Sequence, residues 1–490
     1  MQIHNVRLGF ATNSSSQHSM VFLDGQRDRD IEDGDFGWQR FTAASKEAKG
    51  EYFGVLVMMA LSRMCDEHTA RLIVSDLLGH KAPGENSYID HQSAYDLPVS
   101  WEGNGLDLEF AKEFRDFLLQ DGLVILGGND NSEECHPLLS KAEGFSLAMN
   151  QDAGYDHLVA RKDPSGFWTI FSRKTGAKMR FRFPKRGEEV SKSTYGSAPD
   201  GKVVPTKTFA PELVDIKITN YCPRKCSFCY QNSGPGGQHA EWRHYGYHIS
   251  SILGSLRVFE VAIGGGEPTS HPDFADILRE FRRHGVVPSF STRDLSWLKD
   301  PTKWHPILES TGAFAYSVDE PGQSIEEFAA VLNANGFRHE LEKLVPQPTV
   351  HHVMIGDWMG DFKGFLRSAF NHGIHVVLLG HKLAGRGGMA NPIKSDDWIK
   401  TLSELQKADE CPRISIDTTL AKTFSKQLKK SGIPDWLLEK KEGAFSMYVD
   451  LVERQIGPSS FCNNEEKVNL DLTQGNKVAE KQILDAFSSW

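Results

Sequence analysis

The chain has 490 residues, 39% of them hydrophobic, and its 65 Asp and Glu residues outnumber its 55 Lys and Arg residues, which gives a formal charge of -10 at pH 7. This length predicts about two or three domains. The acidic balance mildly disfavours wholesale nucleic-acid binding, which favours basic surfaces, and leaves a local basic groove open as an alternative. The longest apolar run, 52–61, covers about half of the roughly 20 residues that a membrane span needs, so no membrane segment is expected.

The cysteines and the N-terminus indicate the compartment. Seven cysteines, an odd number with three clustered, fit a reducing compartment better than a disulfide framework. The N-terminus lacks the pattern of a signal peptide. We therefore expect a cytoplasmic protein.

Residues 1–184 predict an α+β domain whose role the sequence does not identify. The hydroxyl-rich segment from Thr12 to Ser16 is typical of a loop or cap, and an active-site or anion-binding role is the alternative. Lys178, Arg180 and Arg182 alternate with apolar residues, which indicates a solvated sheet face or, alternatively, a contact with an acidic substrate. The expected elements are helices over 51–80 and around 110–118, a strand over 123–126, and antiparallel strands over 158–161, 167–171 and 179–183.

A linker and a strand precede a cysteine-rich loop. Residues 185–210 are rich in Lys, Gly, Ser and Pro without periodicity, and 214–220 alternate as a strand does. The next residues place Cys222, Cys226 and Cys229 at the spacing C-x-x-x-C-x-x-C. Iron-sulfur cubes normally take four cysteines, so three thiolates around one metal centre leave one iron open. A zinc knuckle or chance clustering is the alternative.

A second strand, expected over 258–263, ends in the sequence Gly-Gly-Gly-Glu-Pro at 264–268. Together with the cysteine loop, in this order and at this distance, the motif closely resembles the radical S-adenosylmethionine (radical SAM) superfamily. The resemblance covers roughly 211–420 and says little about the N-terminal domain.

The resemblance implies the cofactors and the chemistry. The three cysteines would hold a 4Fe-4S cluster, and the amino and carboxylate groups of SAM would chelate its fourth iron. Reductive cleavage of SAM would yield a 5'-deoxyadenosyl radical that abstracts hydrogen from a substrate, with a one-electron reductant such as flavodoxin or ferredoxin as partner. Gly265, Gly266 and Glu267 would bind the SAM amino group, and Phe228 would lie beside the adenine or, alternatively, pack the loop.

Six consecutive β/α units follow from the cysteine strand onward. Such units require right-handed crossovers and a curved parallel sheet, so residues 211–400 predict a partial (β/α)6 TIM-type barrel. Chemistry in barrels of this type lies at the C-terminal ends of the strands. The expected strands cover 214–220, 258–263, 288–292, 313–318, 349–355 and 375–379.

The ends of strands three and four provide candidate site residues. Ser291, Thr292 and Arg293 end strand three, and Ser291 and Arg293 are candidates for a SAM contact and a substrate contact. Ser317 and Asp319 end strand four, where the resemblance places the SAM ribose and carboxylate. Each of these residues is alternatively a strand cap. No catalytic residue is assigned beyond the cluster and the SAM site.

Strands five and six add further candidates. Alternation places His351 and His352 on opposite faces of strand five, one inside the barrel and one under a helix. Strand six ends in a glycine-rich loop with Lys382 and Arg386, which we expect to be flexible and to hold a substrate carboxylate or phosphate. A solvated turn is the alternative.

Residues 401–490 predict a short C-terminal extension with strands over 413–419 and 444–452. Many peptide-modifying relatives carry auxiliary iron-sulfur clusters in such an extension. Here only Cys411 and Cys462 are present, with Cys65 and Cys135 far upstream, so buried structural thiols are the better interpretation.

The leading functional hypothesis is radical modification of a peptide or protein, because the large N-terminal domain could present a polypeptide. A small-molecule or nucleotide substrate is the alternative, supported by Lys382 and Arg386. RNA modification is disfavoured by the acidic balance and by the lack of an aromatic and basic strip. A structural or redox-sensing cluster is disfavoured by the Gly-Gly-Glu-Pro strand end, since such a cluster needs no SAM site.

Overall fold

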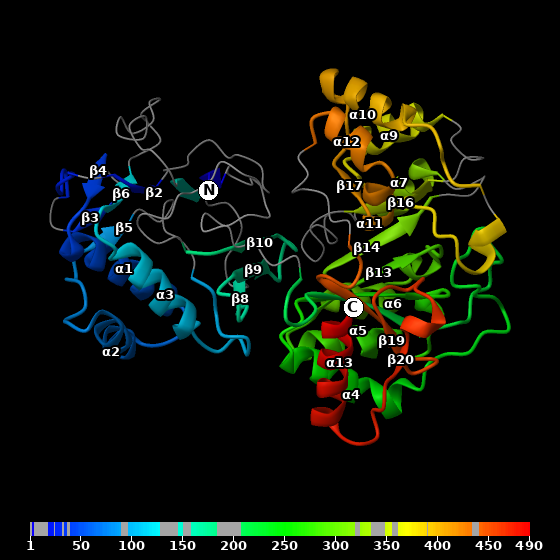
Figure 1. Ribbon diagram of the computed structural model, residues 1–490, viewed down its shortest axis with the longest axis horizontal. Helices are drawn as coiled ribbons and strands as arrows, with labels where there is room; N and C mark the ends of the chain where they lie inside the picture. Colours follow the sequence, from blue (N-terminus) through cyan, green and yellow to red (C-terminus); the bar gives the residue numbers. More distant parts are fainter. Residues whose placement is uncertain are drawn as a thin grey trace. The chain divides into compact units, whose positions relative to one another are not determined.

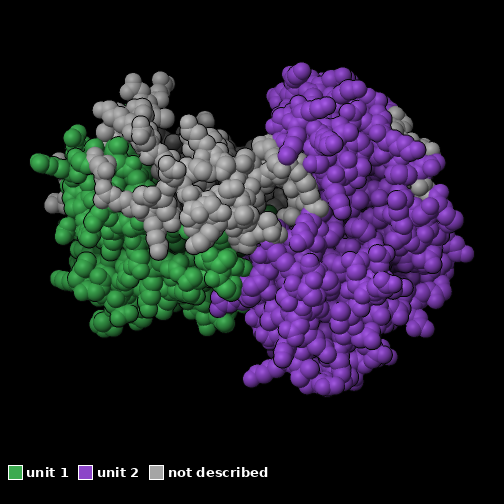
Figure 2. Space-filling model, in the orientation of Figure 1, with its two compact units in different colours: residues 1–205 green, residues 206–490 purple. Residues whose placement is uncertain are grey.

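The computed structural model describes two compact units, residues 1–205 and 206–490 (Figure 2). Each unit has its own hydrophobic core. The candidate residue Asp319, the segment from Thr12 to Ser16 and Cys135 lie outside the described residues. The described residues are 2–3, 18–23, 25–31, 34–36, 40–89, 97–127, 146–149, 158–183, 207–318, 324–334, 348–354, 361–389, 391–433 and 441–490.

Unit 1 contains the predicted α+β elements. The helical stretch expected over 51–80 is two helices, because the Asp66 side chain accepts a hydrogen bond from Thr69 N and starts a new helix. The helices are α1 (Lys46–Leu61), α2 (Glu67–Leu78) and α3 (Leu108–Leu118). A five-stranded sheet has the order β1 (Gln2–Ile3), β7 (Ser146–Met149), β2 (His18–Phe22), β6 (Leu123–Gly127) and β4 (Phe41–Ala43), and β3 (Asp35–Phe36) pairs with β5 (Tyr88–Ile89).

The three antiparallel strands predicted near the end of unit 1 are confirmed. They are β8 (Leu158–Lys162), β9 (Trp168–Ser172) and β10 (Lys178–Phe181), in the order β10-β9-β8. The turn after β8 forms through the Asp163 side chain, which accepts a hydrogen bond from Ser165 N. Trp168 and Phe181 from these strands pack against Phe110 of α3, which joins the small sheet to the core of unit 1.

Unit 2 is a mixed α/β fold around a ten-stranded sheet. Its order is β17-β16-β15-β14-β13-β12-β11-β18-β19-β20, in which β11 to β18 are parallel and β19 and β20 are antiparallel additions. This order has two different edges, so the sheet formed by the described residues is open. The strands are β11 (Leu213–Thr219), β12 (Glu260–Gly265), β13 (Val287–Thr292), β14 (Ala313–Ser317), β15 (Thr349–Met354), β16 (His375–Gly380), β17 (Ile414–Ile416), β18 (Ser446–Asp450), β19 (Gln455–Gly457) and β20 (Val468–Asn469).

The two faces of this sheet differ. Val214, Ile216 and Ile218 of β11 are buried in the core formed with the helices. The alternate residues of β11 and its neighbours face the other side, and several, such as Asp215 and Ser289, are only partly buried although they lie on central strands. The helices are α4 (Trp242–Ser255), α5 (Phe274–Arg283), α6 (Pro301–Ser310), α7 (Ile325–Asn333), α9 (Phe362–Asn371), α10 (Asp397–Lys407), α11 (Thr418–Thr423), α12 (Ser425–Lys430) and α13 (Asn476–Ser489) (Figure 1).

The C-terminal segment is part of unit 2. The strand predicted over 444–452 is β18, which lies beside β11 with Asp215 opposite Tyr448. Helix α13 lies beside α4, where His248 Nδ1 is 2.8 Å from Asn476 Oδ1 and Ser255 donates a hydrogen bond to Glu480 (Figure 1). Across the described residues, the helices are all too short or too polar to cross a bilayer.

Candidate active site

Strand β11 delivers the cysteine loop, and backbone hydrogen bonds fold the loop back on itself. Cys222 N donates to Gly234 O over 3.0 Å, and Cys229 N donates to Cys226 O over 3.3 Å. The Cys226 side chain is buried, while Cys222 and Cys229 are partly exposed, and none of the three forms a disulfide. The loop therefore presents three reduced thiols from one short segment.

This donor set fits an iron-sulfur cluster, which is held by cysteine thiolates. Burial raises the pKa of the Cys222 thiol, with the Arg293 charge opposing the shift. A bound metal removes that proton outright, because a coordinating thiol is deprotonated. Among the described residues, no set of three or more His, Cys, Asp or Glu side chains converges on the position of a single metal ion.

Two glycines bring the end of β12 onto the start of the cysteine loop. Gly266 N donates to Thr219 O over 2.7 Å, and Glu267 N donates to Tyr221 O over 2.8 Å. A Cβ on Gly266 would lie 1.9 Å from Tyr221 O. Gly265 has a φ of 118°, and its Cβ would lie 2.3 Å from Thr219 O. Side chains at either position would separate the two motifs, which explains why both residues are glycine.

The Glu267 carboxylate is buried and already accepts several hydrogen bonds. Its Oε1 accepts from the Thr292 and Thr269 hydroxyls, each over 2.7 Å, and its Oε2 accepts from Arg293 N over 2.9 Å. Burial raises the pKa of Glu267, and the bonds from Thr292, Arg293 and Thr269 oppose that shift. Glu267 thus connects the end of β12 to the end of β13.

Phe228 and Arg293 are brought together at the cysteine loop. The Arg293 guanidinium lies 5.3 Å from the centre of the Phe228 ring, within the range of a cation–π interaction. Arg224 of the loop donates to Arg293 O over 3.2 Å. Both predicted residues therefore lie beside the candidate cluster site.

The predicted serines lie on the polar face of the sheet. Ser291 and Ser317 are partly exposed, and Ser317 lies opposite His351 in the register of β14 and β15. The opposite orientation of the two histidines is confirmed: His352 is 2% exposed and packs on Phe365 of α9. Burial lowers the pKa of His351 to about 4, with further contributions from His375, Lys382 and Arg293, so His351 is neutral at pH 7.

Lys382 is held between two aromatic rings. Its Nζ lies 4.7 Å from the centre of the Tyr230 ring and 5.0 Å from that of Phe461. Burial alone would lower the pKa of the Lys382 ammonium, but Tyr230, Asp417 and Asp215 outweigh that effect and raise the pKa above its ordinary value. The ammonium is therefore charged, and acidic side chains of the sheet interior already lie near it.

Arg386 lies against the cysteine loop itself. Its Nε donates to Cys226 O over 2.9 Å, and its Nη2 donates to Ser233 O over 2.7 Å. The sequence indicated a loop that binds substrate, and no pattern in it predicted this contact. The glycines around Arg386 were the available signal, because they permit close approach of one backbone to another.

The sequence also did not predict a buried ion pair that connects β11 and β18. Lys217 Nζ lies 3.0 Å from Asp450 Oδ2, and both side chains are less than 10% exposed. Tyr448 donates a hydrogen bond of 3.2 Å to the same oxygen. A lysine between Ile216 and Ile218 in a central strand was the signal, since a buried charge requires a partner.

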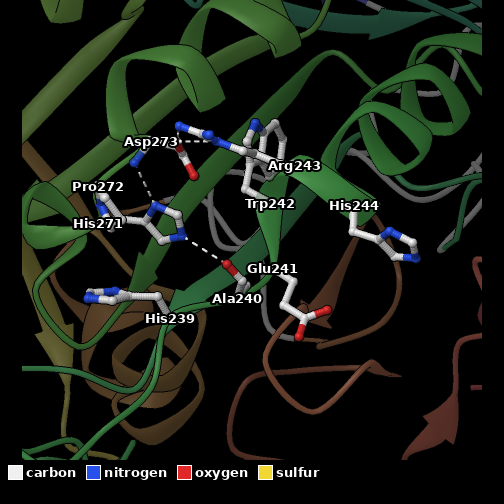
Figure 3. Close-up of a pocket in the computed structure, with 9 residues that line it drawn as sticks. All are labelled: His239, Ala240, Glu241, Trp242, Arg243, His244, His271, Pro272 and Asp273. Atoms are coloured by element: carbon white, nitrogen blue, oxygen red, sulfur yellow. Dashed lines mark hydrogen bonds and ion pairs between the residues drawn. The ribbon is translucent and has the colours of Figure 1, made fainter.

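A hollow of about 340 Å³ lies at the start of α4, and the three cysteines are not among its lining residues (Figure 3). His271, at its wall, has both ring nitrogens engaged: Nδ1 accepts from Asp273 N over 3.1 Å, and Nε2 donates to Ala240 O over 3.2 Å (Figure 3). His239 Nδ1 lies 2.9 Å from the Thr219 hydroxyl at the end of β11. His239 thus contacts the end of β11 that leads into the cysteine loop, and His271 packs against His239 with the ring centres 5.1 Å apart.

A comparison with protein-family models indicates the class of protein to which this fold and site correspond. Residues 216–356 match the sequence model of the radical SAM superfamily, and the two motifs joined by Gly266 and Glu267 lie within that range. The chain therefore contains a radical SAM domain, the domain of a class of enzymes whose cofactors are a 4Fe-4S cluster and SAM.

Among known proteins, the chain is similar to the mycofactocin maturase MftC of Mycobacterium ulcerans (strain Agy99), with 34% identity over 83 residues, which are 17% of this chain and 22% of that relative. The match thus spans about a fifth of the relative's length. Among solved structures, Streptococcus suis SuiB gives a TM-score of 0.46 at 12% identity and covers 69% of this chain and 88% of its own. The structure of anSMEcpe with bound AdoMet gives 0.39 at 13% identity and covers 56% and 82%.

Proposed function

We propose that the protein is a radical SAM enzyme that modifies a peptide or protein by hydrogen abstraction. The observation that carries the radical SAM assignment is the direct hydrogen bonding of the Gly265-Gly266-Glu267 strand end to both ends of the segment Thr219–Tyr221, which leads into the three cysteines. A 4Fe-4S cluster held there would supply one electron to SAM and so generate the 5'-deoxyadenosyl radical that attacks the substrate.

Each residue has a proposed role at this site. Cys222, Cys226 and Cys229 hold the cluster, and the strand end at 265–267 orients the SAM amino group. Phe228, Ser291, Ser317 and Asp319 are the proposed remaining SAM contacts. Arg293 and Lys382 lie near the same centre and are the proposed substrate contacts, within a partial (β/α)6 barrel over 211–400.

The peptide substrate has two supports. The relative with 34% identity over 83 residues is called a maturase, and unit 1 is a separate body of the chain that could present a polypeptide to unit 2. We propose residues 1–184 for this role, 185–210 as the linker and 401–490 as an extension that completes the sheet. A reductant such as flavodoxin or ferredoxin and a cytoplasmic location complete the proposal.

A small molecule is the second candidate substrate. It is favoured by Lys382, whose charged ammonium lies inside unit 2 near Asp215 and Asp417. A small zwitterionic molecule would find both signs of charge there. The peptide hypothesis places substrate recognition largely in unit 1, whereas the small-molecule hypothesis places substrate recognition wholly in unit 2.

The test is anaerobic SAM cleavage by the reduced, reconstituted enzyme, followed by chromatography for 5'-deoxyadenosine with and without peptide, small-molecule and RNA fractions. Stimulation by the peptide fraction is expected, and stimulation by another fraction would move the substrate to that class. Cys222→Ala should abolish iron loading and cleavage together, while Cys411→Ala, outside the loop, should preserve both. Cleavage retained without Cys222 would refute the cluster assignment.

A further inference from the structure

The glycine-rich segment Gly380–Met389, here called the clamp loop, lies directly on the cysteine loop. The backbone N of Arg386 donates to Cys229 O over 3.1 Å, and its Nε donates to Cys226 O over 2.9 Å. Its Nη2 donates to Ser233 O over 2.7 Å, and its Nη1 to Asn232 Oδ1 over 2.9 Å. One arginine therefore bonds to four acceptors that span the loop from the second cysteine to its end.

The backbones of the two loops approach too closely for side chains between them. Gly385 has a φ of 53°, and a Cβ there would lie 2.5 Å from Tyr230 O. A Cβ on Gly387 would lie 2.3 Å from Lys382 O and 3.2 Å from Phe228 O. Gly385 thus permits close contact with the cysteine loop, and Gly387 permits the close approach of the clamp loop to its own Lys382 O and to Phe228 O.

The clamp loop is also held at its own base. Gly380 N donates to Asp417 Oδ1 over 2.8 Å, and His381 Nε2 donates to Gly387 O over 2.7 Å. Lys382 adds its cation–π contact with Tyr230, the residue after the third cysteine. The loop that the sequence predicted to be flexible is therefore anchored at its start and along its length as far as Gly387.

The chemistry of the contact points to the cluster rather than to a substrate. Arginine carries a permanent charge and presents its donors in a planar fork, and here the fork is directed at carbonyl groups of residues that carry or follow the thiols. Groups that hydrogen-bond to metal-ligating residues orient those ligands. Nearby charges and hydrogen bonds set the reduction potential of an iron-sulfur cluster. A cationic group beside the cluster stabilises the more negative, reduced form.

We propose that Arg386 is a positioning residue of the cluster, which holds the carbonyl groups of Cys226 and Cys229 in place and raises the cluster's reduction potential through its charge. This inference rests on the proposed function, because it requires a cluster on the three cysteines. It assigns Arg386 to the cofactor side of the site and leaves Lys382 and Arg293 as the substrate candidates.

The test uses the reconstituted full chain and two readouts that do not depend on turnover: the rate at which a chelator removes iron, and the midpoint potential from an EPR-monitored titration. Arg386→Gln should lose iron about 10- to 100-fold faster than the wild type, and its potential should shift to more negative values. Arg386→Lys keeps the charge without the fork, so faster iron loss with a nearly unchanged potential is expected. Arg279→Gln, on the exposed side of α5, is the matched control.

Wild-type iron loss and wild-type potential in Arg386→Gln would overturn the proposal, as would equal changes in Arg279→Gln. If Arg386→Gln does not fold, Arg386→Lys decides, and iron loss at the wild-type rate in that variant overturns the proposal. The measurements distinguish a failure of the proposed function from a failure of the role of Arg386. A wild-type protein that loads no cluster defeats the proposed function, whereas a loaded wild type with an unaffected Arg386→Gln variant defeats only the role of Arg386.

Discussion

At the scale of single residues, Glu267 has a second role beside the one that its motif suggests. Its carboxylate accepts from the Thr292 hydroxyl and from Arg293 N, so it organises the end of β13 in addition to its proposed role in binding SAM. Glu267→Ala would leave these donors unpaired, at a cost of about 1–3 kcal/mol for each group that stays buried. We expect weaker SAM binding and a lower free energy of unfolding, with the iron content retained.

Equilibrium dialysis with SAM, an iron assay and urea unfolding measure these three effects. Thr292→Val keeps the carboxylate and removes the hydroxyl that donates to Glu267 and accepts from Asp294 N, so it should lower the stability with a smaller loss of SAM affinity. Glu309→Ala, on the exposed surface of α6, is the control. Unchanged SAM affinity in Glu267→Ala would remove the residue from the SAM site.

His351 predicts the pH dependence of stability. Burial, His375, Lys382 and Arg293 lower its pKa to about 4 in the folded state from an ordinary value of 6.5. Between these two values the unfolded chain binds a proton that the folded chain does not, so the free energy of unfolding should fall as the pH drops through that window. His375, whose pKa burial also lowers to about 4, contributes in the same direction.

His351→Asn removes this proton uptake from the unfolded state. The difference in urea midpoint between pH 7.5 and pH 5.0, measured on the metal-free protein, should therefore be smaller in the variant than in the wild type. The exposed His305→Asn should leave the difference unchanged. An equal difference in His351→Asn would show that His351 titrates alike in both states.

At the scale of elements, the addition of β18 beside β11 depends on a buried ion pair. Lys217 and Asp450 are paired over 3.0 Å, and Asp450 Oδ1 also accepts from Val452 N and Glu453 N after the strand. Asp450→Ala would leave the Lys217 charge buried without its partner. We expect a loss of about 3–5 kcal/mol in the free energy of unfolding.

Urea unfolding of Asp450→Ala and of the double variant Lys217→Met, Asp450→Leu measures this pair. Replacing both partners by apolar groups removes the unpaired charge, so the double variant should be more stable than Asp450→Ala. The opposite order would show that the cost comes from the loop after β18 rather than from Lys217.

The same elements show what the sequence could and could not predict. The strands over 214–220 and 288–292 were found within a few residues because their alternation is local. The pairing of β18 with β11 could not be predicted, since Lys217 and Asp450 are 233 residues apart and no periodicity connects them. The contact of the clamp loop with the cysteine loop could not be predicted for the same reason, because Arg386 and Cys226 are 160 residues apart in the sequence.

At the candidate site, the spacing of residues in the sequence predicted which side chains would act as metal ligands. It did not predict the contacts between residues far apart in the chain. The three cysteines and the glycine strand end were recognisable because their chemistry requires fixed distances along the chain. The bonds from Thr292 and Arg293 N to Glu267, and the role of Arg386, depend on how strands meet at one edge of the sheet. Only the fold brings those residues together.

At the scale of the whole molecule, the core of unit 2 and all of the candidate site lie within residues 206–490. We therefore expect a chain of residues 206–490 to fold, load the cluster and cleave SAM without residues 1–205. If unit 1 presents a polypeptide, this shortened chain should no longer be stimulated by the peptide that stimulates the full chain, and its basal 5'-deoxyadenosine formation should persist. Iron analysis and chromatography of both chains, side by side, measure the cluster content and the formation of 5'-deoxyadenosine.

Peptide stimulation that survives in the shortened chain would place substrate recognition in unit 2 and favour a small substrate near Lys382. A shortened chain that unfolds would show that the two units depend on each other for stability.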